Sequence, residues 1–576
     1  MRHSLFALVL ATALASQLAP AQASPGGDRL KQILTIQIAV TLRQQPQVAT
    51  FLGDYEHDAD LSTPGHAGLI AAQRSLDEFE HALNGVDMKG ATLGERNDLR
   101  LLRALIAGQR RQLAEARAGK DAGGPPLEIV GVIFTMIMHK DEQDRNVWWD
   151  HAISRIEKAP AWLAAERTLI TRPGRLQAEV ASKQLANAPG LFTGVLAGMA
   201  STELSGPRKA RFDKASKALV ASLTEWKSWL DANAPNWPMN YAMGRPAYDK
   251  MLKDELLLPY DADGIAAIGQ TVLAGATAQE SAVLADAKAK GIDLKDVKRA
   301  AAVGGGTTPT TKDEQFAFFQ SALDTLNTFV RDKHIVTIPD YMGTMRIVET
   351  PPFLQPILPG PSMDAPPLLS KHKDGVYFVP PPDPQMTQRA AAGAIFEDFD
   401  RDRVLMTSGH EGIPGHFLQL SIAKHNPDPI RRFSFDSVFA EGWAFYEERL
   451  LEQQGLYGAD GLDGRYAVAQ FERLRGARAV VDAKLATGEW PFDQALSWFK
   501  QNAGVDDDTA LGEVSRHALN PGQAFDYAVG RAQIDDLLAK YRARKGPAFN
   551  LQAFHDDLLS HGTIPLSVVA AEMLAE

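Results

Sequence analysis

Residues Glu314–Asp332, EQFAFFQSALDTLNTFVRD, repeat helix-forming side chains at helical spacing. They follow a loop rich in glycine and threonine that ends at Thr311, three residues before Glu314. A threonine followed three residues later by a glutamate is typical of a capping box, in which the two side chains bind free N–H groups of the first helical turn. The stretch therefore predicts a helix that begins directly after Thr311.

The same texture extends over most of the chain. Alanine, leucine, glutamate, lysine, glutamine and arginine recur with helical spacing from Asp28 to about Lys333, for example in Gly94–Ala118 and Ala210–Ala232. The texture resumes near Asp383 and continues to the end. Neither a repeat of fixed period nor a flexible interdomain linker interrupts it. This pattern favours a mainly α fold that forms one large helical domain.

Composition changes between the two helical regions. His334–Ile338, Met345–Val348 and Gly375–Val379 have the composition of short strands, and a proline-dense segment lies among them. Prolines at this density exclude a helix and a central strand, but they suit an ordered loop and edge strands. We therefore expect a few short β-strands near the active-site cleft, just before the segment that carries most of the candidate chemistry.

Charge and cysteine content exclude several classes of protein. The 576 residues include 60 lysines and arginines against 71 aspartates and glutamates, a net charge of −11, which argues against a protein built to bind nucleic acid or anionic lipid. The absence of cysteine excludes disulfides, thiolate metal sites, cysteine nucleophiles and a lipidated N-terminal cysteine. Any metal must therefore be bound by histidine, aspartate and glutamate.

The first residues have the pattern of an export signal. A positive n-region at residues 1–3 precedes the apolar run LFALVLATALA at 5–15, and an A-x-A cleavage site ends at Ala23. We predict a signal peptide at 1–23 and a mature protein at 24–576. The most apolar internal stretch, Ile129–Met138, is too short to span a bilayer, and it is expected to form a buried helix. A periplasmic or secreted protein without stable membrane insertion is expected.

The segment SGHEGIPGHFLQ at 408–419 contains a candidate metal motif. Two histidines with a glutamate beside the first are typical of zinc hydrolases, in which that glutamate takes a proton from the attacking water. The usual spacing is H-E-x-x-H, whereas His416 lies six residues after His410. On a straight helix this places the two side chains about 240° apart. Pro414 and Gly415 lie between them, and such a pair breaks a helix, so two looped-out residues return His416 to the metal side.

A carboxylate that could complete the site follows in AEGWAFYEER. Glu441 lies 25 residues after His416, which leaves room for a turn and the start of an antiparallel helix. Glu447 and Glu448 are expected to be solvated helix charges, because glutamate is almost never buried unless it is paired. Glu447 has an alternative role as a partner that holds a histidine ring nitrogen. Spacing alone leaves both a metal site and a structural role open.

The motifs HEGIPGHFLQ and AEGWAFYEE resemble the HExxPGHxxQ and EGWAxYxE signatures of the bacterial DUF885 family. QPQVATFLG at 45–53 and NPGQAFDYAVG at 520–530 are similar to two further elements of that family, in the same order. The resemblance covers most of the mature chain. It implies a helical fold and a zinc hydrolase similar to gluzincin-type metallopeptidases. It also implies one Zn²⁺ per chain, bound by His410, His416 and Glu441, with Glu411 as general base.

Tyr527, within the matched C-terminal element, is a candidate for a second catalytic role. Amide hydrolysis develops an oxyanion, and a phenol or imidazole directed at it lowers the barrier. We favour Tyr527 as this donor, with Tyr446 and His517 as alternatives. The remaining histidines are expected to lie at the surface or to be satisfied core residues; these are His425, His517, His555 and His561.

These interpretations together predict an exported zinc metallopeptidase that acts on peptides or small proteins. The short strands offer an edge along which an extended substrate pairs its main chain. One alternative is a zinc amidase that acts on non-peptide or cell-wall amides, since the same site serves both reactions. Another is a catalytically silent helical binding protein. The sequence does not distinguish endopeptidase from exopeptidase, and it does not specify an oligomeric state.

Overall fold

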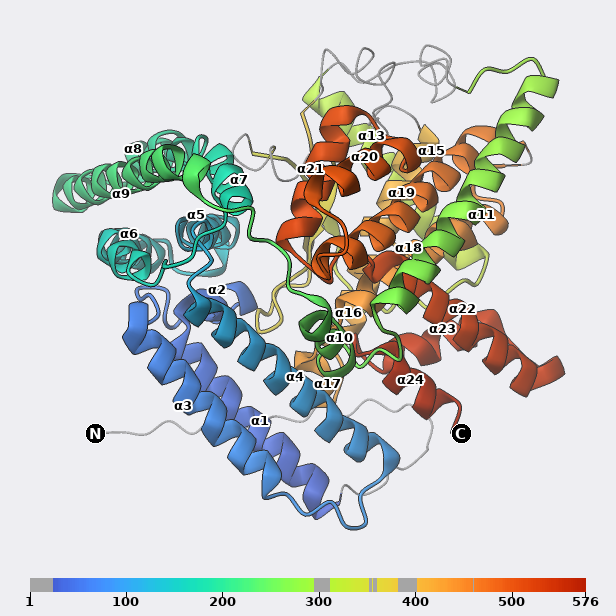
Figure 1. Ribbon diagram of the computed structural model, residues 1–576, viewed down its shortest axis with the longest axis horizontal. Helices are drawn as coiled ribbons and strands as arrows, with labels where there is room; N and C mark the ends of the chain where they lie inside the picture. The colour runs from blue at the N-terminus through green and yellow to red at the C-terminus, as the bar shows by residue number, and fades with distance from the viewer. Residues whose placement is uncertain are drawn as a thin grey trace.

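A computed structural model describes residues 24–294, 311–351, 355, 360–381, 401–458 and 460–575. The predicted signal peptide at 1–23 lies outside the described residues. The described chain is mainly helical, with one small three-stranded sheet, which confirms the expected fold class (Figure 1). None of the helices in these ranges combines the length and the apolar character that a membrane span requires.

The first helices form two groups (Figure 1). Helices α1, α3 and α4 pack side by side, and the short α2 connects α1 to α3. A second group encloses its own cluster of buried apolar residues, with Trp148, Trp149 and Phe212 at its centre. The bounds are α1 Pro25–Gln44, α2 Pro46–Leu52, α3 Gly65–Asn84 and α4 Leu93–Ala118, then α5 Gly124–Met138, α6 Arg145–Arg167, α7 Arg175–Leu185, α8 Ala197–Glu203 and α9 Gly206–Asn233. Residues 129–138 thus lie in the buried part of helix α5, as expected.

The remaining helices surround the candidate site. The predicted capping box is present at the start of α13, where Thr311 accepts from the backbone of Glu314 and the Glu314 carboxylate binds the backbone of Thr311. The bounds are α10 Arg245–Asp254, α11 Ala262–Ala289, α13 Lys312–Asp332, α15 Arg401–Glu411, α16 His416–Lys424, α17 Pro429–Phe433, α18 Ser437–Gln453, α19 Leu462–Ala486, α20 Phe492–Asn502, α21 Asp507–Leu519, α22 Asp526–Lys545, α23 Leu551–Ser560 and α24 Leu566–Met573.

The sheet has the order β1–β3–β2. β1 (Met345–Glu349) runs parallel to the fully buried β3 (Gly375–Val379), and β2 (Ser362–Asp364) runs antiparallel to β3. Two of the three predicted strands are thus confirmed, and β2 is an edge strand within the proline-dense segment, as that composition allows. The predicted strand at 334–338 is wrong.

Side chains of α23 explain why residues 334–338 form no strand. His555 Nδ1 lies 2.7 Å from the carbonyl oxygen of Ile335, and the Asp556 carboxylate accepts the backbone N–H of Thr337 at 2.8 Å. Backbone groups that would pair with a neighbouring strand are therefore bound by side chains. A buried apolar segment and a β-strand require the same residue types, so this segment has the composition of a strand.

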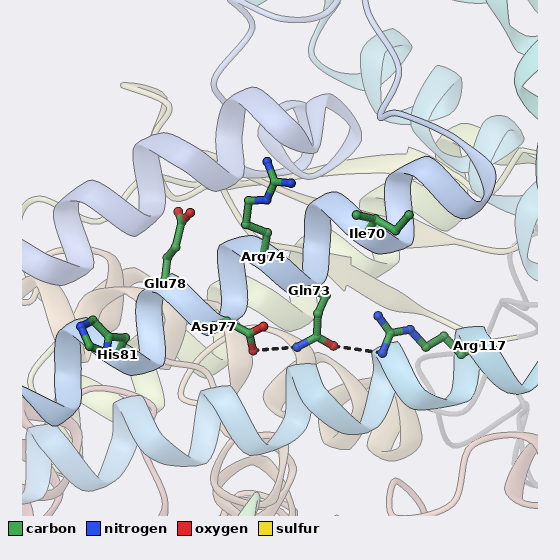
Figure 2. A pocket seen from close by; sticks show the side chains of 7 residues that line it. All are labelled: Ile70, Gln73, Arg74, Asp77, Glu78, His81 and Arg117. Carbon is green, nitrogen blue, oxygen red and sulfur yellow. Dashed lines mark hydrogen bonds between the residues drawn. The ribbon is translucent and has the colours of Figure 1, made fainter.

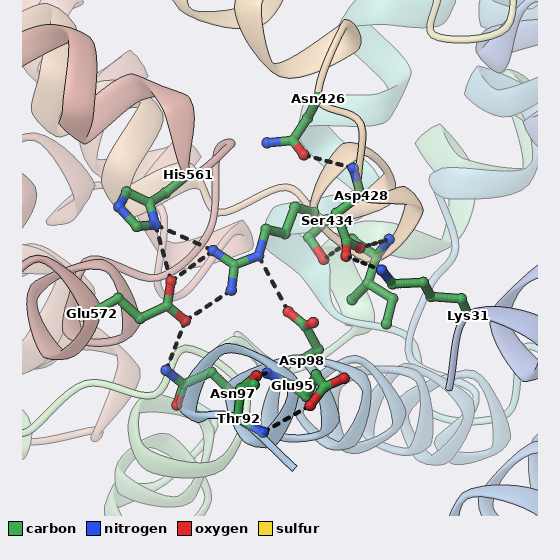
Figure 3. A network of polar contacts seen from close by, with 12 residues as sticks. Lys31, Thr92, Glu95, Asn97, Asp98, Asn426, Asp428, Ser434, His561 and Glu572 are labelled. Atoms are coloured by element: carbon green, nitrogen blue, oxygen red, sulfur yellow. Dashed lines mark hydrogen bonds and ion pairs between the residues drawn. The ribbon is translucent and has the colours of Figure 1, made fainter. Parts of the chain in front are cut away.

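Arg431 of α17 connects the two ends of the chain. Its guanidinium donates two hydrogen bonds of 2.8 Å to the Glu572 carboxylate of α24 and one of 3.3 Å to Asp98 of α4. Figure 3 shows the surrounding network, in which Asn97 and His561 also contact Glu572. This partly buried network stabilises the contact of α17 with α4 and with the C-terminal helix α24.

Helices α18 and α22 cross with almost no space between their backbones. A Cβ atom on Gly442 would lie 2.4 Å from Cα of Gly530, and one on Gly530 would lie 1.9 Å from the Val438 carbonyl oxygen. Both separations are well below van der Waals contact, so neither position accepts a side chain without movement of backbone. The crossing matters for function because α18 and α22 carry Glu441 and Tyr527.

Replacing Gly442 by alanine is expected to lower the free energy of unfolding by about 1–3 kcal/mol, because the two helices must separate. Urea unfolding of the purified variant measures this change. Gly275→Ala is the matched control, since a Cβ there meets nothing within 4 Å in the middle of α11. That control is expected to gain up to about 1 kcal/mol from helix propensity. Equal stability of the two variants would contradict the close crossing.

Candidate metal centre

The two histidines of the motif lie on different helices. α15 ends at Glu411 and α16 begins at His416, so the predicted helix break is present. The backbone N–H of Gly415 donates to the Gly409 carbonyl oxygen at 2.9 Å, which returns the chain onto the end of α15. The His410 and His416 rings are edge to face, with centroids 4.7 Å apart. The break therefore brings together two side chains that a straight helix would separate.

Glycine is required in this turn because backbone approaches backbone. A Cβ atom on Gly415 would lie 1.9 Å from the His410 carbonyl oxygen, and one on Gly412 would lie 2.6 Å from the Ser408 carbonyl oxygen. Trp443 of α18 donates its indole N–H to the Pro414 carbonyl oxygen at 2.9 Å and holds the turn against that helix. The turn is therefore positioned by the same helix that supplies Glu441.

Glu441 faces both imidazoles. Its Oε2 atom lies 3.3 Å from His416 Nε2 and 3.6 Å from His410 Nε2. This oxygen is buried and has no hydrogen-bond partner, although the side chain as a whole keeps 20% of its exposure. One ligand atom from each of His410, His416 and Glu441 lies within 4.8 Å of the others. The structure thus places all three residues predicted as metal ligands in one cluster.

Carboxylates around this cluster raise the proton affinity of His410. Burial lowers the pKa of His410, but Glu441 and Glu448 outweigh this effect and raise it to about 9. Burial raises the pKa of Glu441, and the two imidazoles outweigh it and hold that pKa well below its usual range. Burial also raises the pKa of Glu411 above its usual value. Several carboxylates thus surround the imidazoles.

Tyr527 lies beside the cluster, on the first turn of α22. Its ring stacks on the ring of His410 with centroids 6.2 Å apart, and it is largely buried. Burial and the nearby Glu441 charge raise the pKa of its phenol well above the usual value, so the hydroxyl stays protonated and can donate a hydrogen bond. The structure places Tyr527 beside the cluster, and its role as an oxyanion donor stays a prediction.

Asp482 of α19 positions the turn that leads to Tyr527. Its carboxylate accepts the backbone N–H groups of Gly522 and Ala524 at 3.0–3.1 Å and the Tyr248 hydroxyl at 2.7 Å. Gly522 has φ of +96°, a left-handed conformation in which glycine is favoured. Asp482 was not identified from the sequence, because its partners lie 40 and 42 residues away along the chain.

The alternative oxyanion donors have other partners. The Tyr446 hydroxyl lies 3.0 Å from His555 Nε2, and His555 is a buried histidine bound at both ring nitrogens, as expected for a core residue. His517 is fully buried with its Nε2 3.2 Å from Glu513, and burial lowers its pKa to about 4. Among the three candidates, only Tyr527 has a ring contact with a predicted ligand within the described residues.

Comparison with known proteins identifies the family of this chain, and it also finds solved structures with the same fold. A family model matches residues 46–573 and is described as DUF885, a bacterial protein of unknown function. The chain belongs to the DUF885 family. No curated protein matches it. Two solved structures share the fold of this DUF885 chain, and each is described as that of a "putative lipoprotein".

The first structure is from Shewanella oneidensis, and its protein is further described as "of unknown function". It is 21% identical, with a TM-score of 0.75 over 95% of this chain and 99% of that one. The second is from Colwellia psychrerythraea. It is 16% identical, with a TM-score of 0.77 over 96% of this chain and 99% of that one.

Glu448 of the DUF885 chain is not a solvated helix charge, and that expectation is wrong. Only 1% of its side chain is exposed, and its Oε1 atom lies 2.8 Å from His410 Nδ1. Arg475 of α19 pairs with the same carboxylate at 2.7 and 3.1 Å and stacks on the rings of Phe445 and Tyr527. Burial is possible because α19, distant in sequence, supplies a paired cation. Glu448 therefore orients His410 with Nε2 toward the cluster.

Glu447 is also buried rather than solvated. It is fully excluded from solvent, neither carboxylate oxygen has a hydrogen-bond partner, and burial raises its pKa well above the usual range. No hydrogen bond joins Glu447 to a histidine within the described residues, so its alternative role as a partner of a ring nitrogen is wrong too. Glu448 fills that role.

Replacing Glu448 by glutamine is expected to weaken zinc affinity about 10- to 100-fold, because an amide orients the His410 ring less firmly and leaves Arg475 without a counter-charge. Competition with a metal chelator of known affinity measures this change. Glu447→Gln is the matched control on the same helix, because an amide replaces a carboxyl group that burial already keeps neutral. Equal zinc affinities of the two variants would contradict the role assigned to Glu448.

The sheet lies against this centre in the DUF885 fold. Burial raises the pKa of the Glu411 carboxyl group, and the backbone of Met363 in β2 lies close enough to offset part of this effect. β2 is an edge strand of the described sheet, so the edge opposite β3 lies beside the proposed general base. The two predicted strands also lie near this segment: the Tyr377 hydroxyl of β3 is 3.1 Å from Ser408 Oγ, and a Cβ on Gly412 would lie 3.0 Å from Met345 Sδ of β1.

A hollow of about 490 Å³ lies away from this centre, between α3 and α4. Figure 2 shows that its polar side chains bind one another: Gln73 donates to Asp77 at 2.7 Å and accepts from Arg117 at 3.0 Å. None of its lining residues belongs to the cluster around His410. This hollow and the candidate metal centre therefore share no residue.

Proposed function

We propose that this DUF885 protein is an exported zinc metallopeptidase. One observation supports this proposal most strongly: the buried Glu441 Oε2 atom lacks a hydrogen bond while it faces the Nε2 atoms of His410 and His416. A buried carboxylate oxygen without a partner is costly unless a cation binds it. Glu411 lies next in sequence to His410, and Tyr527 stacks on its ring. The proposed base, Glu411, and the proposed hydrogen-bond donor, Tyr527, therefore both lie next to the proposed ligand His410.

The donor set and its spacing fit zinc. Tetrahedral zinc has bonds of about 2.0–2.2 Å to imidazole nitrogen and carboxylate oxygen, so neighbouring ligand atoms lie about 3.3–3.5 Å apart. The separations of 3.3 and 3.6 Å from Glu441 Oε2 to the two Nε2 atoms agree with this geometry. Two histidines and one glutamate are also the ligand set of catalytic zinc sites that keep one position open. His410, His416 and Glu441 would thus bind the metal.

Each residue of the proposed site then has its own role in the reaction. Bound zinc would supply a Lewis acid that polarises a carbonyl and acidifies water. Glu411 accepts a proton from the water that attacks the amide carbonyl, and it passes this proton to the leaving amine nitrogen. Tyr527 donates its phenolic O–H to the oxyanion as charge develops on the former carbonyl oxygen. Glu448 and Arg475 keep the His410 ring oriented throughout.

The free edge of β2 suits an extended substrate. A peptide lying along β2 would exchange main-chain hydrogen bonds with it, which requires no particular side chains. Met363 of β2 lies close to Glu411, so the strand leads toward the proposed base. Peptides and small proteins are therefore the proposed substrates, in preference to small amides that cannot pair with a strand.

Export rests on the N-terminal pattern and on the two similar structures. Both of those proteins are described as lipoproteins, which are exported proteins. This chain has no cysteine to receive a lipid, so we propose a periplasmic or secreted protein released by cleavage after Ala23. Expression of the full-length chain, followed by fractionation and N-terminal sequencing, tests this part. A mature protein that begins at Ser24 is expected.

Incubation of the zinc-loaded mature protein with a mixture of peptides tests the proposed activity. We expect new peptide termini by mass spectrometry, abolished by a chelator and restored by zinc. Hydrolysis of cell-wall fragments without hydrolysis of peptides would favour the amidase alternative. Absence of any hydrolysis by protein that contains one zinc per chain would favour the binding-protein alternative.

A further inference from the structure

A pair of arginines lies on the Tyr527 side of the metal centre. Arg478 of α19 has its guanidinium carbon 5.5 Å from the centroid of the Tyr527 ring, and its side chain is only 9% exposed. Arg516 of α21 lies next to it, and both bind the same carboxylate, Glu513. We call Arg478 and Arg516 the arginine pair.

The two guanidinium groups of the arginine pair share one carboxylate at contact distance. Glu513 is the one carboxylate within ion-pair distance of either arginine among the described residues. Burial lowers the pKa of the neighbouring His517 to about 4, so this histidine adds no charge near neutral pH. Glu513 is thus shared by two guanidinium groups, and Glu441 and Asp482 act on them from further away.

Hydrogen-bond donors of the arginine pair also remain available. Arg478 binds Glu513 through Nε and Nη2, and its Nη1 has no hydrogen-bond partner within the described residues. Arg516 donates through Nη1 to Gln523 at 2.7 Å and contacts Glu513 at 3.2 Å, while its side chain keeps 37% of its exposure. A planar guanidinium with free N–H groups binds a carboxylate, the common anion of peptides, through parallel hydrogen bonds.

We propose that the arginine pair binds the terminal carboxylate of the substrate, so that the enzyme removes residues from the carboxyl end of peptides. This inference rests on the proposed peptidase function and names its substrate class. The centroids of the His410 and Tyr527 rings are 6.2 Å apart, and the Arg478 guanidinium carbon lies 5.5 Å from the Tyr527 centroid. The reach from the His410 ring to the Arg478 guanidinium is therefore at most about 12 Å. A metal–ligand bond of about 2 Å and a hydrogen bond of about 2.8 Å take up part of this reach. A chain rises about 3.3–3.6 Å per residue, so the remainder holds one or two residues beyond the scissile bond.

Matched peptides test the proposal directly. Each N-acetylated sequence is made twice, once with a free carboxylate and once with a carboxamide at its C-terminus. We expect release of single residues or dipeptides from the acids, and kcat/KM values about 10- to 100-fold lower for the amides, because the charge-assisted hydrogen bonds are lost. Equal rates for acid and amide, or cleavage only at internal bonds, would overturn the proposal and leave the peptidase function intact.

Arg516→Gln supplies the variant test, because this exposed side chain can change without loss of the fold. We expect KM for the acid to rise about tenfold, so that the preference for the acid over the amide is largely lost. Arg465→Gln is the matched control, since Arg465 has a similar exposure of 39%, lies on α19 and pairs with Asp286. An identical effect of both changes, or none from Arg516→Gln, would contradict the proposal.

A binding measurement decides the question independently of turnover. Calorimetry with the zinc-loaded Glu411→Gln protein compares N-acetyl-Ala-Phe with its carboxamide. We expect the acid to bind at least tenfold more tightly, and we expect Arg516→Gln in the same background to abolish that difference. Equal dissociation constants would refute the carboxylate site even if the protein hydrolysed peptides. Preference for the acid in a protein without hydrolysis would support the carboxylate site and refute the peptidase function.

Discussion

Glu411→Gln is expected to lower kcat for peptide hydrolysis by a factor of about 10²–10⁴ while the protein retains one zinc per chain. Glutamine has the same shape as glutamate, so the turn between α15 and α16 is expected to be preserved. It cannot accept a proton, however, and the attacking water then lacks a base. Steady-state kinetics together with metal analysis of the same sample measure both quantities.

Glu489→Gln is the control for this change. Glu489 is a half-exposed residue that pairs with Lys484, away from the described cluster, so its replacement is expected to leave kcat unchanged. Full activity in Glu411→Gln would show that Glu411 is not the base. Loss of zinc together with loss of activity would mean that Glu411 helps to hold the metal, and the roles of Glu411 and Glu441 would need revision.

His410→Ala is expected to reduce the zinc content from about one per chain to near zero. The substitution removes a ligand atom and leaves Glu441 and Glu448 without the ring that separates them. A metal present at a thousand times its dissociation constant stabilises a fold by about 4 kcal/mol, so Tm of the zinc-loaded native protein should fall when a chelator is added. In His410→Ala the chelator should have no effect on Tm.

His425→Ala is the control histidine for this experiment. His425 follows α16, and its Nδ1 lies 2.8 Å from the Ser421 carbonyl oxygen of the same helix. Its replacement is expected to leave both the zinc content and the response to chelator unchanged. Zinc content that is equal in His410→Ala and the native protein would disprove the proposed ligand set.

The helix break at the centre illustrates what short-range pattern can predict. Pro414 and Gly415 are local signals, and the wrong spacing of His410 and His416 on a straight helix follows from helical geometry alone. The structure confirms the break, and it shows that a Cβ atom on Gly415 would overlap the His410 carbonyl oxygen. Capping at Thr311 was predictable for the same reason, because both partners lie within one helical turn.

Predictions that depended on distant partners were less successful. Residues 334–338 have the composition of a strand, but α23 binds their backbone groups. Burial of Glu448 requires Arg475, 27 residues further along the chain. The role of Asp482 requires backbone groups 40 residues away. None of these contacts leaves a periodic or adjacent signal in the sequence.

The amino-acid sequence by itself therefore determined the helical character of the chain, the helix break and the identity of the chemically competent residues. Local propensity and residue chemistry act over a few positions, so they can be recognised without a partner. The packing of α18 against α22 and α19 determined that Glu441 faces two imidazoles, that Glu448 orients His410 and that Arg478 lies beside Tyr527. These relations depend on which side chains meet across helices, because burial makes a charge costly until a distant residue pairs with it.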